Sequence, residues 1–576
     1  MEEKTSKKKK SVAMEVFSLV LILILGIITV SSATSGHRYI AGDPVPLYVN
    51  KIGPYANSME SYRYFDLSFC SSELASEEKE ILVHAPYKFE FRVDFESKQL
   101  CKKSLKREDL AKFRDAIDKD YFFEMNLDDL PVWGFVGSKS WNDPYRSMPK
   151  LHTSLSFKIF YNGDRICDAV MHTYRSVDIS EDKEMEVEFL YSVKWTKTSI
   201  PFERRMDRYI LSLHYFSIMK SYIWVIVLTG FFAAILMRVL KNDLAKYAIN
   251  DDLIIDQEEI GWKNIHGDVF RYPKHKSLLA ASIGSGIRLL VVFSSMLVIG
   301  FLDVFPPYNQ GKFVTALIVI YALASFLAGY TSTSFYCQLE GANWVKNLIM
   351  TEFLFSGPLF LMFCFLNAIA SMHNANAAKS LGTIFVLLMW ILLGSPLLVF
   401  GGIAGKNRNI GFEAPCKTTK CPREIPPLPW YKGIILKMFI AGILPFSMIS
   451  IQLRYIFANL WGYKFYNMYG ILFIVFLLLL LVTAFVTVAL TYLQLASEDH
   501  RWWWRSFFYG GSAGLFVYGY CFDYYAQSGM SGFIQKSFFF GYMACLSYGI
   551  FLALGTVGFF ASILFVRHIY GSVKCE

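Results

Sequence analysis

The sequence predicts an α+β membrane protein, in which an N-terminal, lumenal, β-sandwich-like domain precedes a nine-helix transmembrane bundle. Three observations support this fold class. Long apolar segments recur through the C-terminal part of the chain, strand-like alternation fills much of the stretch before them, and a short apolar segment follows a basic N-terminus. These features divide the chain into a signal peptide (1–33), a lumenal domain (34–217), a nine-span domain (218–566) and a cytosolic tail (567–576).

The first 33 residues have the pattern of a secretory signal peptide. The lysines from Lys7 to Lys10 precede an apolar run from Val16 to Val30, and small residues ending at Ala33 follow it. A charged start, a short apolar core and small residues at the cleavage site define such a peptide, so we expect cleavage after Ala33. The length of the apolar run leaves an uncleaved signal anchor as the alternative.

The lumenal domain carries the alternation of half-buried strands. The dipeptide Asn162-Gly163 supplies the positive φ angles of a tight hairpin turn. One helix is expected at 107–119, where Leu110, Phe113 and Ile117 share a face. Several short strands with one helix favour a β-sandwich. The expected strands are 88–95, 155–161, 165–174 and 184–195.

Three cysteines lie in this domain, namely Cys70, Cys101 and Cys167. An oxidising compartment favours one disulfide among them. We choose Cys70–Cys101, which leaves Cys167 as the free thiol, although sequence alone does not fix the pairing.

Nine apolar segments are each about as long as the roughly 20 residues that cross a bilayer. Each must be helical, because the hydrocarbon offers no water to its backbone groups. The basic residues concentrate in the loops that this arrangement places in the cytosol, so the net charge of +9 indicates membrane topology rather than nucleic acid. The segments are 220–240, 278–303, 313–335, 346–370, 378–403, 434–460, 469–495, 506–528 and 537–566.

Two charges lie inside expected spans, Arg288 and Glu352. A charge in a membrane is costly and is usually paired or functional, so each is a candidate partner for the other. Prolines at positions 358, 396 and 445 interrupt three spans, as in some transporters. A secondary transporter or channel that uses these features is therefore the alternative function.

Two further patterns have both a functional and a packing interpretation. Small residues at 284–286 and 510–514 let helices approach closely, either within the bundle or against a helix of another protein. His266 and Asp268 share a loop, but two isolated ligands do not make a metal site, so we expect a hydrogen-bonded loop packed under the helices.

Long motifs in the loops and span ends give the chain a family resemblance. It resembles the nonaspanins, also called the transmembrane 9 superfamily or endomembrane protein 70 family, and is most similar to the plant members. The motifs are Asp129–Gly137 (DLPVWGFVG), Gly261–Arg271 (GWKNIHGDVFR), Phe335–Gly341 (FYCQLEG), Pro422–Trp430 (PREIPPLPW) and Glu498–Arg505 (EDHRWWWR).

The resemblance implies residence in Golgi and endosomal membranes, a role in sorting and localising other membrane proteins, and no enzymatic activity or cofactor. The implied partners are transmembrane cargo proteins, the lipid bilayer and the COPI coat, with no nucleic acid. The coat would read the family's Lys-x-Asp/Glu ending, which is present here as Lys574 and Glu576. An ammonium, a side-chain carboxylate and the terminal carboxylate on a short tail form a compact pattern of charges that a coat protein can pair.

Overall fold

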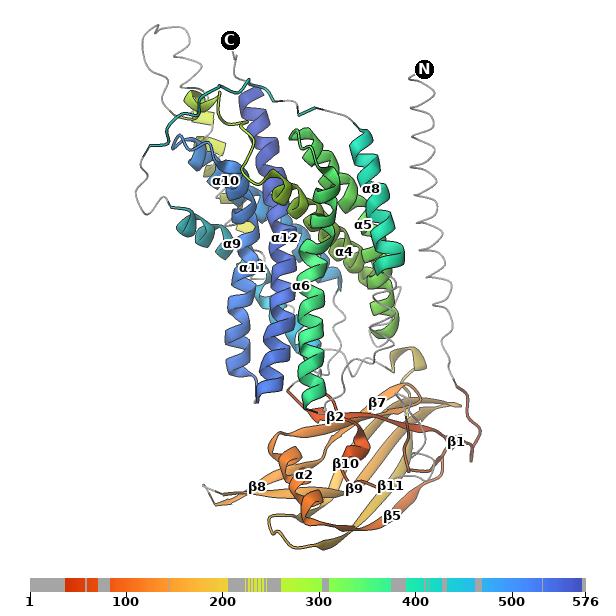
Figure 1. The fold of residues 1–576 in the computed structure, drawn as a ribbon. Helices are drawn as coiled ribbons and strands as arrows, with labels where there is room; N and C mark the ends of the chain where they lie inside the picture. The colour runs from red at the N-terminus through yellow and green to blue at the C-terminus, as the bar shows by residue number, and fades with distance from the viewer. Residues whose placement is uncertain are drawn as a thin grey trace.

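The computed structural model shows an N-terminal head of β-sheets beside one end of a group of long helices (Figure 1). It describes residues 37–205 and 261–571, together with scattered helical positions between 223 and 245. The gaps inside these ranges are 57–59, 71–82, 144–145, 303–309, 374–389, 409–410, 413, 427–432, 462–468 and 531. Ala33, Lys574 and Glu576 therefore lie outside the described residues.

In the described part of the head the strands form three sheets, and one α-helix, α2 (Arg107–Asp118), packs against the larger two. A two-stranded sheet pairs β1 (Pro44–Val45) with β4 (Phe89–Glu90). A four-stranded sheet has the order β3-β2-β6-β7, and a five-stranded sheet has the order β10-β9-β11-β5, with β8 also paired to β9. Their bounds are β2 (Leu47–Pro54), β3 (Val83–His84), β5 (Phe95–Leu105), β6 (Tyr121–Leu127), β7 (Leu130–Phe135), β8 (Gly137–Asp143), β9 (Arg146–Asn162), β10 (Arg165–Asp178) and β11 (Met185–Lys197).

The predicted hairpin is confirmed, since β9 and β10 pair antiparallel around Gly163, whose φ is 64°. The predicted strand at 88–95 is wrong. The chain leaves β4 at Glu90 and turns at Arg92, which has a φ of 63°, before β5 begins at Phe95. The Arg92 guanidinium stabilises the turn by donating to the Gly163 carbonyl, a contact between distant residues that period-two alternation does not encode.

The four- and five-stranded sheets and α2 share one buried core. The face of α2 predicted from sequence is buried in it, with Leu110, Phe113 and Ile117 at most 1% exposed. Val49 and Phe157 bring the two sheets to the same core. The sheets are thus established, while the more specific description as a β-sandwich stays a prediction.

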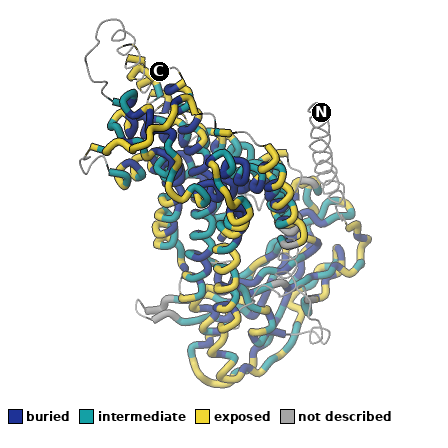
Figure 2. The backbone as a smooth tube through the Cα atoms, turned by 45° about the horizontal axis from the view of Figure 1, so that its top comes forward, coloured by how far each residue is buried: buried dark blue, intermediate teal, exposed yellow. Residues whose placement is uncertain are grey.

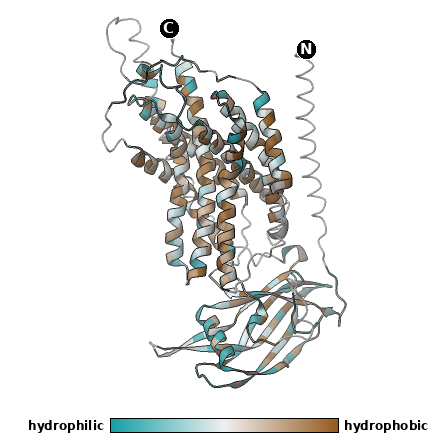
Figure 3. Cartoon of the chain, in the orientation of Figure 1, coloured by the Kyte–Doolittle hydropathy of each residue, from teal (hydrophilic) through white to brown (hydrophobic). Residues whose placement is uncertain are grey.

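Six helices are long and apolar enough to cross a membrane, and the described residues include no others that meet both criteria. Figure 3 shows apolar residues covering them, in contrast to the mixed colouring of the head strands. They are α4 (Lys276–Phe301), α5 (Gln310–Gln338), α6 (Trp344–Met372), α9 (Ile434–Trp461), α10 (Tyr469–Leu495) and α12 (Phe533–Gly571).

The count of nine spans is therefore not confirmed. The predicted span 220–240 is described only in part, with a shorter apolar helix at Thr229–Val239. The first part of the predicted span 378–403 lies outside the described residues, and the rest forms a π-helical turn, η6 (Trp390–Gly394), followed by α8 (Ser395–Asn407). Span 506–528 lies on α11 (Trp502–Gln527), which has 26 residues but is too polar to join the six.

Small residues pack the helices against one another inside the bundle. A Cβ added to Gly510 of α11 would lie 2.5 Å from the Leu554 carbonyl oxygen and 3.0 Å from the Cα of Gly558, both on α12. A Cβ on Gly284 would meet Ser332 and Ala328 of α5. Figure 2 shows buried residues where helices meet in this way. Of the two interpretations of these small residues, internal packing is the one that the structure shows.

Candidate functional site

The two intramembrane charges meet across two helices. The Arg288 side chain on α4 places its Nη2 atom 2.7 Å from Oε2 of Glu352 on α6. The side chains are nearly inaccessible, at 2% and 7% exposure. Inside apolar helices an unpaired charge would be costly, and direct pairing with additional hydrogen bonds offsets part of that cost.

Three more side chains complete this cluster. Tyr321 of α5 accepts a hydrogen bond of 3.0 Å from Nη1 of Arg288 and also bonds Ser356 at 2.8 Å. Trp390, in the π-helical turn η6, donates its indole N–H to Oε1 of Glu352. Each carboxylate oxygen of Glu352 thus has a donor from the protein, so the cluster can fasten α4, α5, α6 and η6 together without a ligand.

A polar track connects this cluster with the end of α6 that lies away from the head. Ser277 Oγ lies 3.2 Å from Oδ1 of Asn347, whose Nδ2 lies 2.8 Å from Ser332 Oγ. Ser332 in turn bonds Thr351 at 2.6 Å, and Thr351 precedes Glu352. Because these groups bond one another, the track supplies interhelical hydrogen bonds inside the bundle.

At the same end of the bundle, a folded loop forms a cap that we define as Gly261–Arg271. Asp268 is its centre. It accepts hydrogen bonds from Arg271 at 2.6 Å, from Thr419 at 3.1 Å and from the Arg423 backbone N–H at 3.0 Å. Burial alone would raise the pKa of Asp268, but these donors outweigh it and lower the pKa below the ordinary value.

The cap binds the C-terminal end of α12. The Tyr570 hydroxyl donates to the Trp262 carbonyl at 2.6 Å, and the two rings meet edge to face. Trp502 donates its indole N–H to the Val269 carbonyl at 2.9 Å. Since α12 ends at Gly571, the cap fixes the point where the C-terminal tail leaves the bundle.

At the opposite end of the bundle, Ala56, Glu60 and Tyr62 of the head form a seam with the helices. Tyr62 packs against Leu366 and Ala370 of α6 and against Phe538 of α12. Its hydroxyl donates to Oε1 of Glu60 at 2.7 Å. Burial raises the pKa of Glu60, only partly offset by hydrogen bonds from Tyr62 and Gln535. The seam thus contains a carboxylate that is easier to protonate than an ordinary glutamate.

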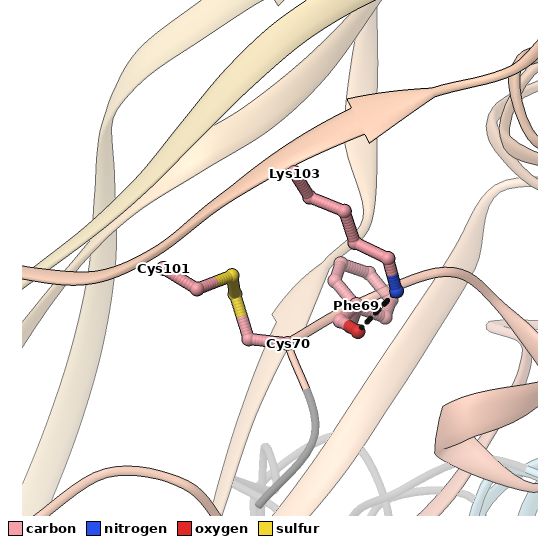
Figure 4. Close-up of a disulfide and its surroundings, with 4 residues drawn as sticks. All are labelled: Phe69, Cys70, Cys101 and Lys103. Carbon is pink, nitrogen blue, oxygen red and sulfur yellow. Dashed lines mark hydrogen bonds between the residues drawn. A yellow bond between two sulfur atoms is a disulfide. The ribbon is translucent and has the colours of Figure 1, made fainter.

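Within the head, Cys70 and Cys101 form a disulfide that joins the segment after η1 (Tyr64–Asp66) to β5 (Figure 4). Beside it, Lys103 Nζ donates to the Phe69 carbonyl at 3.1 Å, so that a hydrogen bond reinforces the same connection. Cys167 is buried and is not part of this disulfide. This is the pairing chosen from the sequence.

Comparison with known proteins decides the family. The family described as endomembrane protein 70 matches residues 61–533. The chain is 56% identical to transmembrane 9 superfamily members 4 and 3 of Arabidopsis thaliana, with 97% and 96% of this chain and 98% of each relative aligned. It is 42% identical to transmembrane 9 superfamily member 1 of Pongo abelii, with 97% of both chains aligned.

The chain belongs to the endomembrane protein 70 family. It is accordingly a multi-pass member of the transmembrane 9 superfamily, as the motifs indicated. The matched family and these relatives carry the names of membrane proteins, not of enzymes. In the part of this endomembrane protein 70 chain that the structure describes, His, Cys, Asp and Glu do not gather in groups of three or more that could hold a metal ion.

Some residues of these sites had no clear signal in the sequence. Ser356 could have been found, because it lies four residues after Glu352 and so on the same helix face. Tyr321 and Trp390 come from other helices, and apolar periodicity does not reveal which neighbour a helix will have. Glu60 and Tyr62 likewise gain their role only through the seam.

Proposed function

We propose that this endomembrane protein 70 protein sorts and localises other membrane proteins in the Golgi and endosomal membranes, with its head in the lumen. In this proposal the COPI coat recycles it by reading Lys574 and Glu576. Family membership supports the proposal, and the carrying observation is the cap, which holds Tyr570 four residues before Lys574.

The cap limits how far the tail reaches from the bundle. Sequence alone placed the end of the last span near Val566, but α12 continues to Gly571. Residues 572–576 follow, and five extended residues span about 17 Å. A coat that reads Lys574 and Glu576 must therefore come close to the cap, and the signal has a fixed starting point.

The test is localisation of tail variants. Lys574→Ala, Glu576→Ala and a chain extended beyond Glu576 should each move the protein from the Golgi to later compartments, because each removes or displaces a charge that the coat pairs. Cys575→Ser is the matched control and should not. A fluorescent tag placed after the signal peptide leaves the tail free.

A second experiment separates charge recognition from anchoring. A short Gly/Ser spacer inserted after Gly571 keeps both charges and moves them away from the cap. Retained Golgi residence would mean that the coat reads the tail alone, whereas loss would mean that it also needs the surface near the cap. Golgi residence that survives loss of both Lys574 and Glu576 would refute coat reading of the tail.

Cargo recognition is proposed for the head and the outer surface of the bundle. The small residues at 284–286 and 510–514 are buried in helix packing, so a cargo helix must bind elsewhere. Photo-crosslinking from exposed apolar positions such as Phe353 and Leu361, with the buried Leu366 as control, would capture such a helix in Golgi membranes.

The alternative, a secondary transporter or channel, would use Arg288 and Glu352 to bind its solute. The donors to both carboxylate oxygens of Glu352 come from the protein itself, which favours a structural role for the pair.

A further inference from the structure

The four-stranded sheet of the head exposes aromatic side chains on its outer face. Along β7, Leu130 and Val132 point into the core and are at most 2% exposed, while Trp133 and Phe135 on the opposite face are 36% and 42% exposed. Tyr55, directly after β2, is 49% exposed. Isolated exposed apolar residues are ordinary on protein surfaces, so the question is whether these three form one patch.

They do form one patch. The rings of Tyr55 and Phe135 have centroids 5.4 Å apart, and both residues flank Phe122, which is opposite Phe135 in the β6–β7 register. Trp133 is two residues from Phe135 on the same face. We call Tyr55, Trp133 and Phe135 the aromatic patch. A contiguous exposed patch of this kind marks a contact with a protein or a membrane.

The position of the patch indicates which of these it meets. Tyr55 is followed by Ala56, which packs against the cluster of Trp461, Met530 and Phe539 at the head side of the bundle. Trp461 is the last residue of α9, and Met530 lies between α11 and α12. The patch thus continues the seam at the head-side end of the helices, which is the side on which these spans leave the hydrocarbon core. Figure 1 shows β2 and β7 on the side of the head that faces the helices and β5 on the opposite side.

The chemistry of the patch also suits a bilayer interface. Trp and Tyr combine an apolar ring with a polar edge, and they are enriched where hydrocarbon meets headgroups. The neighbouring charges on this face, Glu124 opposite Trp133 and Lys51 opposite Glu124, pair at 3.6 Å. Their opposite charges offset one another beside the aromatic rings.

We propose that the aromatic patch docks the head onto the leaflet on its own side of the membrane, with the three rings in the interfacial layer. Docking would then hold the head at a fixed height and orientation beside the bundle. The experiment below distinguishes the lipid leaflet from the competing occupant, which is a segment of another protein.

The test uses the full chain in lipid nanodiscs without any other protein. An encoded environment-sensitive fluorescent amino acid is placed at position 133 and, in a second sample, at position 135. Position 102 is the control, because Lys102 is exposed and belongs to β5, the strand on the side of the head away from the helices. Quenching by a phospholipid carrying a shallow doxyl group is compared with quenching by aqueous iodide.

Docking predicts that doxyl lipid quenches the probes at 133 and 135 more strongly than iodide does, and that this order reverses at 102. Emission at 133 and 135 should also be blue-shifted relative to 102. Strong iodide quenching at both positions with no effect of doxyl lipid would overturn the proposal and favour a protein occupant.

A charge variant tests whether the aromatic rings are responsible. With the probe at 133, Phe135→Glu should reduce lipid quenching and increase iodide quenching. Ser104→Glu adds the same charge to an exposed position on β5 and should change neither. Unchanged lipid quenching in Phe135→Glu would refute docking through the patch, and the Ser104→Glu sample shows that the charge itself does not disturb the fold.

Discussion

Asp268 in the cap and Glu60 in the seam are carboxylates at opposite ends of the bundle, and each residue is 5% exposed. Their pKa values nevertheless move in opposite directions. Asp268 accepts bonds from a guanidinium, a hydroxyl and a backbone N–H, and its pKa is lowered, whereas Glu60 has weaker donors and its pKa is raised by burial. Similar exposure thus goes with opposite pKa shifts, because the Glu60 carboxyl is the more deeply desolvated and has only neutral side-chain donors, whereas a guanidinium stands beside Asp268.

The largest effect is expected at the Arg288–Glu352 pair, which lies between these two ends inside apolar helices. Arg288→Ala should destabilise the bundle by about 3–5 kcal/mol, because it leaves the Glu352 carboxylate buried without its cation. Arg288→Ala combined with Glu352→Ala should cost less than Arg288→Ala alone. Thermal unfolding of the single and double variants in nanodiscs measures the coupling, and additive losses would contradict the pairing.

An intermediate effect is expected at the cap. Asp268→Ala removes the acceptor for three donors, so the cap should lose about 2 kcal/mol of stability. Hydrogen exchange at 566–571 should rise, since the cap holds Tyr570. Asp523→Ala, at an exposed aspartate of α11, serves as the control and should leave this exchange unchanged. Unchanged hydrogen exchange at 566–571 in Asp268→Ala would show that the hydrogen bonds of Asp268 do not stabilise the cap.

The smallest effect is a pH dependence of the seam. Because the pKa of Glu60 is raised in the seam, the contact between the head and the helices is most stable below the ordinary pKa of 4.5. It weakens as the pH rises through the raised pKa. Hydrogen exchange of residues 60–67, normalised to intrinsic rates, should therefore increase from acidic to neutral pH. The seam would thus be tighter in an acidic compartment.

Glu60→Gln should abolish this dependence and keep the seam in its acidic form, because an amide cannot ionise. Glu96→Gln, at an exposed glutamate of β5, should preserve it. A dependence that persists in Glu60→Gln would assign the titration to another group, such as His373, which lies near Glu60 at the end of α6.

The sequence by itself determined the features that depend on neighbours along the chain. Apolar segments of membrane-spanning length became six long helices, the Leu110–Ile117 face became the buried side of α2, and the Asn-Gly turn became a hairpin. In each case the length, the period or the turn residues of a local segment were enough to predict the element. Two charges in hydrocarbon also had to find partners, so Arg288 and Glu352 could be named together.

Only the tertiary structure decided features that depend on which distant groups meet. Alternation at 88–95 predicted a strand, but the turn at Arg92, which donates to Gly163, ended it. Small residues at 510–514 could pack within the bundle or face a partner protein, and the structure packs Gly510 against Gly558 of α12. Trp390 joined the charge pair, and Glu60 acquired its raised pKa, through contacts with other elements. A linear pattern records what a residue can do, whereas burial and available donors, which exist only in the folded chain, decide what it does.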